Sequence, residues 1–234
     1  MNQLEHFFKN ENHRMIHKWN HYFEIYDRHL QHLKGRKINI LEIGVSHGGS
    51  LQMWENYFNG NATIYAVDIN PECKKLESEN IKIFIGSQED EKFLKNLKNS
   101  IPTIDVLIDD GGHTMKQQVT TFKHLFDHVA DDGIYICEDL HTSYWKHFGG
   151  GYKKRRSFIE FSKNFIDKLH AWHTPKVSID NITTSTHSLH YYDSILVIEK
   201  RKMSKPFDVK AGNASIEDQY QNQFVAGADP NSDK

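Results

Sequence analysis

Short apolar runs alternate with longer amphipathic segments along most of this 234-residue chain. Each run is bounded by polar or glycine residues, as expected of a buried strand. Alternation of such runs with helical segments is typical of βα units around a mostly parallel sheet. The predicted strands are residues 38–43, 63–68, 81–85, 106–108 and 134–137.

Apolar residues at helical spacing indicate the helices. Between the fourth and fifth strands, Val119, Phe122, Leu125, Phe126 and Val129 share one helical face, and that helix is expected to pack on the sheet.

The C-terminal half continues with a predicted helix around residues 158–172 and two β-like runs, residues 177–183 and 189–198. The polar residues 184–187 lie between these runs, which predicts an antiparallel pair that closes the sheet edge.

Periodicity divides the chain into three parts. Residues 1–36 are amphipathic and are expected to form a helical extension packed against the core or against a second copy of the chain. Residues 37–202 form the predicted main domain, and the total length suits one domain rather than two. Residues 203–234 have few periodic apolar residues and are expected to form a loosely ordered tail. The helical spacing in the first part is that of Trp19, Phe23, Tyr26, Leu30 and Leu33.

Charge and composition narrow the partners and the compartment. Lys and Arg number 29 and Asp and Glu number 31, a formal net charge of −2, so no overall field favours nucleic acid or an anionic membrane. The N-terminus lacks a signal pattern and no apolar run approaches about 18 residues, so a cytoplasmic protein is expected. Cys73 and Cys137 are expected to be reduced thiols. Most histidines are expected on a solvated face, including His17, His21, His29 and His32.

A glycine-rich turn follows the first predicted strand. Residues 42–50 read Glu-Ile-Gly-Val-Ser-His-Gly-Gly-Ser, and Asp68 ends the second strand 24 residues after Gly44. The glycines let the backbone approach a ligand, and the carboxylate can accept hydrogen bonds from a ribose. Ser46 stands where a dinucleotide fingerprint needs its second glycine, which disfavours a dinucleotide, and no Gly-Lys-Ser/Thr sequence closes a P-loop. A turn that serves packing alone and an NAD-linked dehydrogenase are the alternatives.

Acidic clusters follow the fourth and fifth strands. Residues 109–113 read Asp-Asp-Gly-Gly-His, and residues 138–145 read Glu-Asp-Leu-His-Thr-Ser-Tyr-Trp. The carboxyl ends of strands meet at one edge of an open α/β sheet, so four carboxylates are expected close together. Such crowding is costly unless a cation offsets it, and Mg²⁺ or Mn²⁺ suits oxygen ligands. Zinc is less favoured because the cysteines lie outside the clusters.

These motifs together resemble those of the metal-dependent macrolide-sugar O-methyltransferases of the mycinamicin and macrocin type, and also the related cephalosporin hydroxylase family. The similarity covers about residues 37–150, with weaker similarity at residues 190–194. It implies an α/β, Rossmann-like methyltransferase fold: a mostly parallel seven-stranded sheet with an antiparallel C-terminal edge hairpin and helices on both faces. The implied cofactor is S-adenosylmethionine, which has no pyrophosphate and therefore tolerates Ser46.

The resemblance also implies roles for single residues. Asp110, Glu138 and Asp139 are the implied ligands of Mg²⁺ or Mn²⁺, and Asp110 and His113 are the implied catalytic residues, with His113 as general base. The chain departs from the family's pattern at Gly112, where serine is usual, and at Ser87, where an acidic residue is frequent. The expected contacts to S-adenosylmethionine are Glu42, Gly44, Ser46, Gly48, Asp68, Ser87, Gln88 and Asp109.

The expected reaction is methylation of a hydroxyl on a sugar or glycosylated small molecule. A metal ion lowers the pKa of the hydroxyl, His113 takes its proton, and the oxygen attacks the sulfonium methyl group in line. His141, Tyr144 and Trp145 are expected on the acceptor side, because apolar ring faces suit sugar C–H surfaces; core packing is the alternative for the two aromatic residues. The basic run 153–156 either attracts an anionic acceptor or is solvated surface. Alternative functions are methylation of a catechol-like diol and a non-catalytic, nucleotide-binding partner protein.

Overall fold

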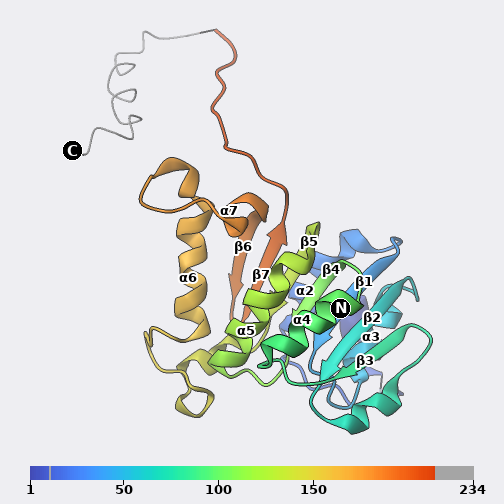
Figure 1. The fold of residues 1–234 in the computed structure, drawn as a ribbon. Coiled ribbons are helices and arrows are strands. Elements are labelled where there is room, and N and C mark those ends of the chain that lie inside the picture. Colours follow the sequence, from blue (N-terminus) through green and yellow to red (C-terminus); the bar gives the residue numbers. More distant parts are fainter. Residues whose placement is uncertain (11, 214–234) are drawn as a thin grey trace.

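The computed structural model describes residues 1–10 and 12–213. Of the predicted C-terminal tail, residues 203–213 form no helix or strand, are mostly exposed, and lead away from the body of the molecule (Figure 1). The rest of that tail, residues 214–234, lies outside the described residues.

A seven-stranded sheet forms the centre of the described fold (Figure 1). Its strands are β1 (Ile38–Ile43), β2 (Ala62–Asp68), β3 (Ile81–Ile85), β4 (Ile104–Asp109), β5 (Val129–Cys137), β6 (Thr186–Tyr192) and β7 (Ile195–Lys200). They lie in the order β3-β2-β1-β4-β5-β7-β6, and β7 is antiparallel to both of its neighbours while β1 to β5 pair in parallel. The apolar runs predicted the first five strands, and the Rossmann-like fold is confirmed.

The edge hairpin exists, but its strands lie elsewhere than predicted. The prediction of a strand over 177–183 is wrong, because α7 (Asn181–Ser185) begins within that run and is N-capped by the side chain of Asp180. β6 and β7 instead divide the run 189–198, which had been predicted as a single strand. The chain turns at Ser194, which has a left-handed φ of 64°.

Helices cover both faces of the sheet. α1 (Gln3–Lys9), α2 (Tyr22–Leu30) and α3 (Gly49–Tyr57) bury their apolar residues on one face. α4 (Glu91–Ser100), α5 (Met115–Leu125) and α6 (Phe158–Leu169) do so on the other (Figure 1). Short 3-10 segments occupy Gln31–Leu33, Pro71–Leu76, Phe126–His128, Leu140–Tyr144, Lys146–Phe148 and Ala171–His173. Apolar residues that alternate along each strand therefore find partners on both sides, which explains the nearly continuous apolar runs.

The N-terminal residues belong to the same apolar core as α3. Phe23, Tyr26, Leu30 and Leu33 are buried there, in agreement with their helical spacing. Trp19 is the exception, because it precedes α2 and is 51% exposed. Between α1 and α2, residues 12–19 form neither helix nor strand, and part of this segment borders the cleft described below.

The prediction for the cysteines is confirmed, whereas that for the histidines is wrong at one residue. His29 is buried, so the prediction of a solvated face is wrong for this residue, which lies on the side of α2 that faces the sheet. His17 and His32 are exposed. Cys73 and Cys137 are both buried free thiols, as predicted. Among the described helices, none combines the length and the apolar character that a membrane span requires.

Candidate active site

A cleft of about 410 Å³ opens at the carboxyl ends of β1, β2, β3 and β4. Ligands of open α/β sheets bind at this edge, and the volume falls within the range of small-molecule sites. The cleft is bordered by the N-terminal segment Met15–Lys18, the glycine turn, Asp68, the turn after β3 and the loop after β4.

The glycine turn fits closely against the loop that follows β4. Gly44 has a φ of 99°, and a Cβ on this residue would lie 2.1 Å from the carbonyl oxygen of Asp110. Only glycine permits both features. Gly48 is left-handed as well, with a φ of 76°, and directly precedes α3, so Gly49 and Ser50 at the start of this helix line the cleft.

Asp68 holds the glycine turn in place. One carboxylate oxygen accepts hydrogen bonds from the backbone amides of Val45 and Ser46, at 2.9 and 3.0 Å, and the other accepts from the amide of Asn70 at 2.8 Å. Burial favours a higher pKa for Asp68, but these backbone hydrogen bonds outweigh it and lower the pKa below its ordinary value. The residue is therefore a carboxylate that still faces the cleft.

Gln88 ties the turn after β3 to the loop after β4. Its side-chain oxygen accepts a hydrogen bond from the amide of Gly112 at 2.8 Å, and its nitrogen donates to Asp109 at 3.0 Å. Burial raises the pKa of Asp109 to about 6. Gly112 is constrained too, because a Cβ there would lie 2.4 Å from the side-chain nitrogen of Gln117, which completes the N-terminal capping box of α5.

A buried lysine joins the two acidic clusters. The Lys18 ammonium donates hydrogen bonds to Asp110 at 2.6 Å and to Glu138 at 2.7 Å, and the Lys18 side chain is only 2% exposed. Glu138 is fully buried and accepts a second hydrogen bond from the Tyr26 hydroxyl at 2.6 Å. Burial works against the charged ammonium, but the carboxylates outweigh it and raise the pKa of Lys18. The two strand ends are thus neutralised in part by a residue of the N-terminal segment.

Asp139 and His113 form the other half of the site. Nε2 of His113 lies 3.3 Å from Asp139 and 3.8 Å from Asp110, whereas its Nδ1 is buried and has no hydrogen-bond partner within residues 1–10 and 12–213. Asp139 accepts a hydrogen bond of 2.7 Å from the Tyr22 hydroxyl. Burial, followed by the adjacent Asp139 carboxylate, raises the pKa of Tyr22, which keeps this hydroxyl a donor.

Three residues of the cleft have a strained backbone conformation. Ser46, His113 and Asp139 have φ values of 50°, 58° and 54°, a left-handed conformation that residues other than glycine seldom adopt. All three line the cleft. Strain of this kind persists where the surrounding structure holds a side chain in a required direction, and it is frequent at functional sites.

The structure separates the predicted cofactor and metal residues into two groups. Gly44, Ser46, Asp68, Ser87 and Gln88 line the cleft, together with Asp110, Asp139 and His113. The residues Glu42, Gly48, Asp109 and Glu138 do not line it. Burial raises the pKa of Glu42 to about 7 despite the opposing charge of Lys18, and one oxygen of Glu42 accepts a hydrogen bond from Ser50. Glu42 therefore acts beneath the cleft, on the residues that line it.

A second cavity, of about 430 Å³, adjoins the loop after β5. His141 and Tyr144 line it together with residues of α6 and of the β6–β7 turn, and the side chain of His141 is hydrogen-bonded to Ser194. Trp145 packs beside them, with its ring centroid 4.6 Å from that of His141. Tyr144 and Trp145 are 50% and 44% exposed, so neither is a core residue. The basic run 153–156 is exposed as well.

The donor set can be compared with the needs of a divalent cation. Ligand atoms of Asp110, His113 and Asp139 lie within 4.8 Å of one another, and carboxylate oxygens suit Mg²⁺ or Mn²⁺. Glu138 directs its oxygens elsewhere, one of them to Lys18. The arrangement fits a hard cation at Asp110 and Asp139, and Glu138 can join them only when the ammonium of Lys18 moves away.

Sequence reasoning missed several residues of this site. Lys18, Tyr22 and Tyr26 bond the acidic clusters across more than 90 positions of the chain. Tyr22 and Tyr26 are four residues apart on one face of α2, which a helical projection could have shown. Lys18 lies in a segment without periodicity, and only the tertiary fold brings it to the sheet edge.

Comparison with known proteins shows which family this chain resembles. A family model described as a methyltransferase domain matches residues 41–140, from β1 to the loop after β5. The 8-demethyl-8-alpha-L-rhamnosyl tetracenomycin-C 2'-O-methyltransferase of Streptomyces olivaceus is 33% identical over 194 residues, which cover 78% of this chain and 51% of that protein. Demethylmacrocin O-methyltransferase of Streptomyces fradiae is 33% identical over 188 residues, or 75% of this chain and 47% of that protein. The chain spans about half the length of the curated relatives it matches.

A solved structure agrees with this result. The MycE methyltransferase from the mycinamycin biosynthetic pathway, in complex with Mg, SAH and mycinamycin VI, superimposes with a TM-score of 0.75 at 29% sequence identity, over 86% of this chain and 53% of that one. Residues 41–140 therefore match a methyltransferase domain, and in both sequence and fold the chain resembles the macrolide-sugar O-methyltransferases.

Proposed function

We propose that the chain is an S-adenosylmethionine-dependent O-methyltransferase that uses a divalent cation and acts on a hydroxyl of a sugar or glycosylated small molecule. The observation that carries this proposal is one cleft with two kinds of wall. The glycine turn and Asp68 form one wall, and Asp110, His113 and Asp139 form the other. The similarity to the rhamnosyl tetracenomycin-C 2'-O-methyltransferase and to demethylmacrocin O-methyltransferase supports the choice of acceptor.

In this proposal the donor lies on the glycine turn. Asp68 accepts hydrogen bonds from the ribose hydroxyls, and the backbone around Gly44 and Ser46 approaches the methionine part. The side-chain amide of Gln88 is hydrogen-bonded to Gly112 and Asp109, so Gln88 positions the loop after β4 against the donor. Ser87 borders the adenine side.

The acidic wall holds the cation and the base. Asp110, Asp139 and Glu138 are the proposed ligands, with Lys18 withdrawing from Glu138. A divalent cation there would act as a Lewis acid toward an acceptor hydroxyl. His113 removes the hydroxyl proton, and the nearby Asp139 carboxylate stabilises the imidazolium that forms.

Methyl transfer then follows from positioning. The acceptor oxygen forms its bond to the methyl carbon while the carbon–sulfur bond of the donor breaks, which leaves S-adenosylhomocysteine and a methyl ether. The proton remains on His113 until solvent removes it. Holding both reactants in line supplies much of the acceleration. The acceptor's remaining groups extend toward His141, Tyr144 and Trp145, whose exposed aromatic faces suit sugar C–H surfaces.

The test combines binding with turnover. Calorimetry should show that S-adenosylhomocysteine binds with or without EDTA, and a panel of glycosides should be methylated only after Mg²⁺ or Mn²⁺ is added. His113→Ala should lower kcat by about 10²- to 10⁴-fold with donor affinity unchanged. His124→Ala, on α5, is the matched control and should retain activity. Full turnover of His113→Ala would refute the proposed base. Donor binding without methylation of any glycoside or catechol would favour a non-catalytic protein.

A further inference from the structure

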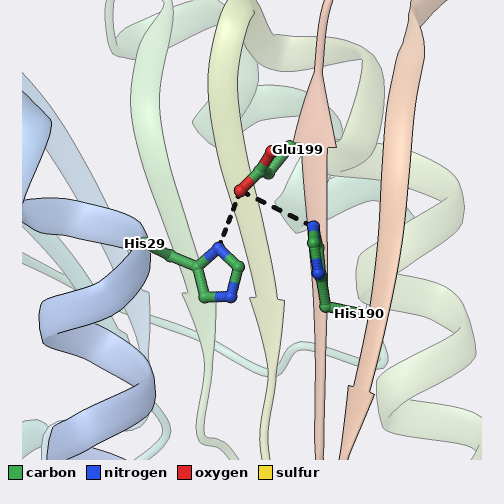
Figure 2. A group of neighbouring side chains, drawn as sticks. All are labelled: His29, His190 and Glu199. Atoms are coloured by element: carbon green, nitrogen blue, oxygen red, sulfur yellow. Dashed lines mark hydrogen bonds and ion pairs between the residues drawn. The ribbon is translucent and has the colours of Figure 1, made fainter.

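A second group of metal-ligating side chains lies apart from the cleft. His29 of α2, His190 of β6 and Glu199 of β7 each offer one ligand atom, and these three atoms lie within 4.8 Å of one another. Figure 2 shows the Glu199 carboxylate pointing between the two imidazole rings, with Nδ1 of His29 at 2.8 Å and Nε2 of His190 at 3.6 Å from the same oxygen. Three separate elements thus converge on one point.

Neighbouring hydroxyls orient these side chains. Nε2 of His29 is hydrogen-bonded to the Tyr192 hydroxyl at 2.8 Å, which fixes the ring so that Nδ1 faces Glu199. Ser188 donates to the other oxygen of Glu199 at 3.1 Å and lies 2.9 Å from Nε2 of His190. Metal-binding histidines are commonly held by an outer hydrogen bond at their second nitrogen, as His29 is by Tyr192. At His190 the hydrogen bond to Ser188 is at Nε2 itself, so zinc would replace this bond.

The cluster is separate from the acidic edge of the sheet. Glu199 pairs with Ile134, which stands four residues before Glu138 on the neighbouring strand. At about 3.3 Å per residue, this places Glu199 roughly 13 Å along the sheet from the level of Glu138. The donors differ as well, because the cleft offers mainly carboxylate oxygens and this cluster offers two imidazole nitrogens.

We propose that His29, His190 and Glu199 bind a zinc ion, with water completing the coordination. Two imidazoles and one carboxylate form a ligand set typical of zinc rather than magnesium. Tetrahedral zinc with bonds of about 2.0 Å separates neighbouring ligand atoms by roughly 3.3 Å. The two separations from the Glu199 oxygen, 2.8 and 3.6 Å, fall on either side of this value, and all three ligand atoms lie within 4.8 Å of one another. His190 and Glu199 are 35% and 34% exposed, which leaves the water position open to solvent.

The zinc would fasten α2 to the edge hairpin. Tyr22, Tyr26 and His29 follow one another along one face of α2, at the spacing of successive helical turns. The two tyrosines donate hydrogen bonds to Asp139 and Glu138. The proposed zinc ligand, His29, lies near the C-terminal end of the same helix. A zinc ion bound to His29 would therefore hold α2 in place, and with it the two tyrosines that orient Asp139 and Glu138.

Cobalt provides a direct probe of this site. The full chain is first freed of bound metal and then kept in excess Mg²⁺, which should occupy the acidic cleft. Added Co²⁺ should then show the strong visible absorption of a four-coordinate, nitrogen-ligated ion, and Zn²⁺ should displace it. His190→Gln and Glu199→Gln should each weaken Co²⁺ binding at least about tenfold, the scale seen even for outer-shell substitutions. His187→Gln, an exposed histidine on the same strand, is the matched control and should bind as the unaltered chain does.

Three results would overturn the zinc proposal. The first is a weak, six-coordinate Co²⁺ spectrum, the second is an equal affinity in His190→Gln and His187→Gln, and the third is no Zn²⁺-dependent rise in Tm for the unaltered chain. The spectrum of the unaltered chain decides the matter even where a variant folds poorly. None of these results depends on methyl transfer, so the methyltransferase proposal stands or falls separately.

Discussion

Lys18→Met removes the one positive charge placed between Asp110 and Glu138 and retains a side chain of similar length. The ammonium makes hydrogen bonds of 2.6 and 2.7 Å in a place where its own side chain is 2% exposed and that of Glu138 is fully buried. The variant leaves these carboxylates close together without compensation, and removing one partner of a buried ion pair typically costs about 3–5 kcal/mol. We expect a loss of that size in the free energy of unfolding, measured in EDTA.

Mg²⁺ should reverse much of this loss. A ligand at about 100 times its Kd stabilises the folded state by about 2.7 kcal/mol, and in Lys18→Met the cation need not displace an ammonium. Denaturant titrations with EDTA and with Mg²⁺ should therefore show a larger Mg²⁺ effect in the variant than in the unaltered chain. Lys75→Met is the control, because Lys75 pairs with Glu72 on the surface and should change stability little. A loss below about 1 kcal/mol, or equal Mg²⁺ effects in both proteins, would refute this reasoning.

Three further substitutions test the walls of the cleft. Gly44→Ala should destabilise the fold by about 3 kcal/mol or more, read from denaturant curves, because its Cβ would meet the carbonyl of Asp110; an intact variant that binds S-adenosylhomocysteine would contradict the close approach. Asp68→Asn should weaken S-adenosylhomocysteine binding in calorimetry. Folding lowers the pKa of Asp68 below 3.8, so the stability that the carboxylate contributes is complete at higher pH and should disappear as the pH falls through the folded pKa. A difference in unfolding free energy between the unaltered chain and Asp68→Asn that stays constant from pH 6 to pH 3 would argue against this. Gly112→Ser should displace Gln117 from its capping box and so cost about 1 kcal/mol of stability, seen as a lower Tm. An unchanged Tm would show that Gln117 can move aside without cost.

The sequence predicted the parts of the site that follow from strand order. The glycine turn, Asp68 and both acidic clusters directly follow parallel strands, and the ends of such strands meet at one edge of the sheet. Strand order alone therefore predicts that these segments lie close together. Strand order does not determine where each side chain points: Glu138 is directed into the protein toward Tyr26, whereas Asp110 and Asp139 of the same clusters line the cleft.

The remaining features depend on tertiary contacts that no local pattern encodes. The hairpin turn at Ser194 holds neither glycine nor proline, so the run 189–198 resembles one strand. The polar residues around His29 predict a solvated position, but the edge hairpin covers the side of α2 that carries this residue. Lys18 lies in an irregular segment, and only the folded chain brings it to Asp110.

These contacts bear on the boundary predicted at residue 36. Glu138 is buried and receives its side-chain hydrogen bonds from Lys18 and Tyr26, while Asp139 receives one from Tyr22. A main domain without the first 36 residues would expose the core face that α2 covers and would leave a buried carboxylate without its donors, and each such loss typically costs several kcal/mol. The net stability of a domain is only about 5–15 kcal/mol, so both losses together would remove most of it. We infer that the N-terminal helices and the sheet fold as one unit, and that the acidic wall takes its shape only when both are present.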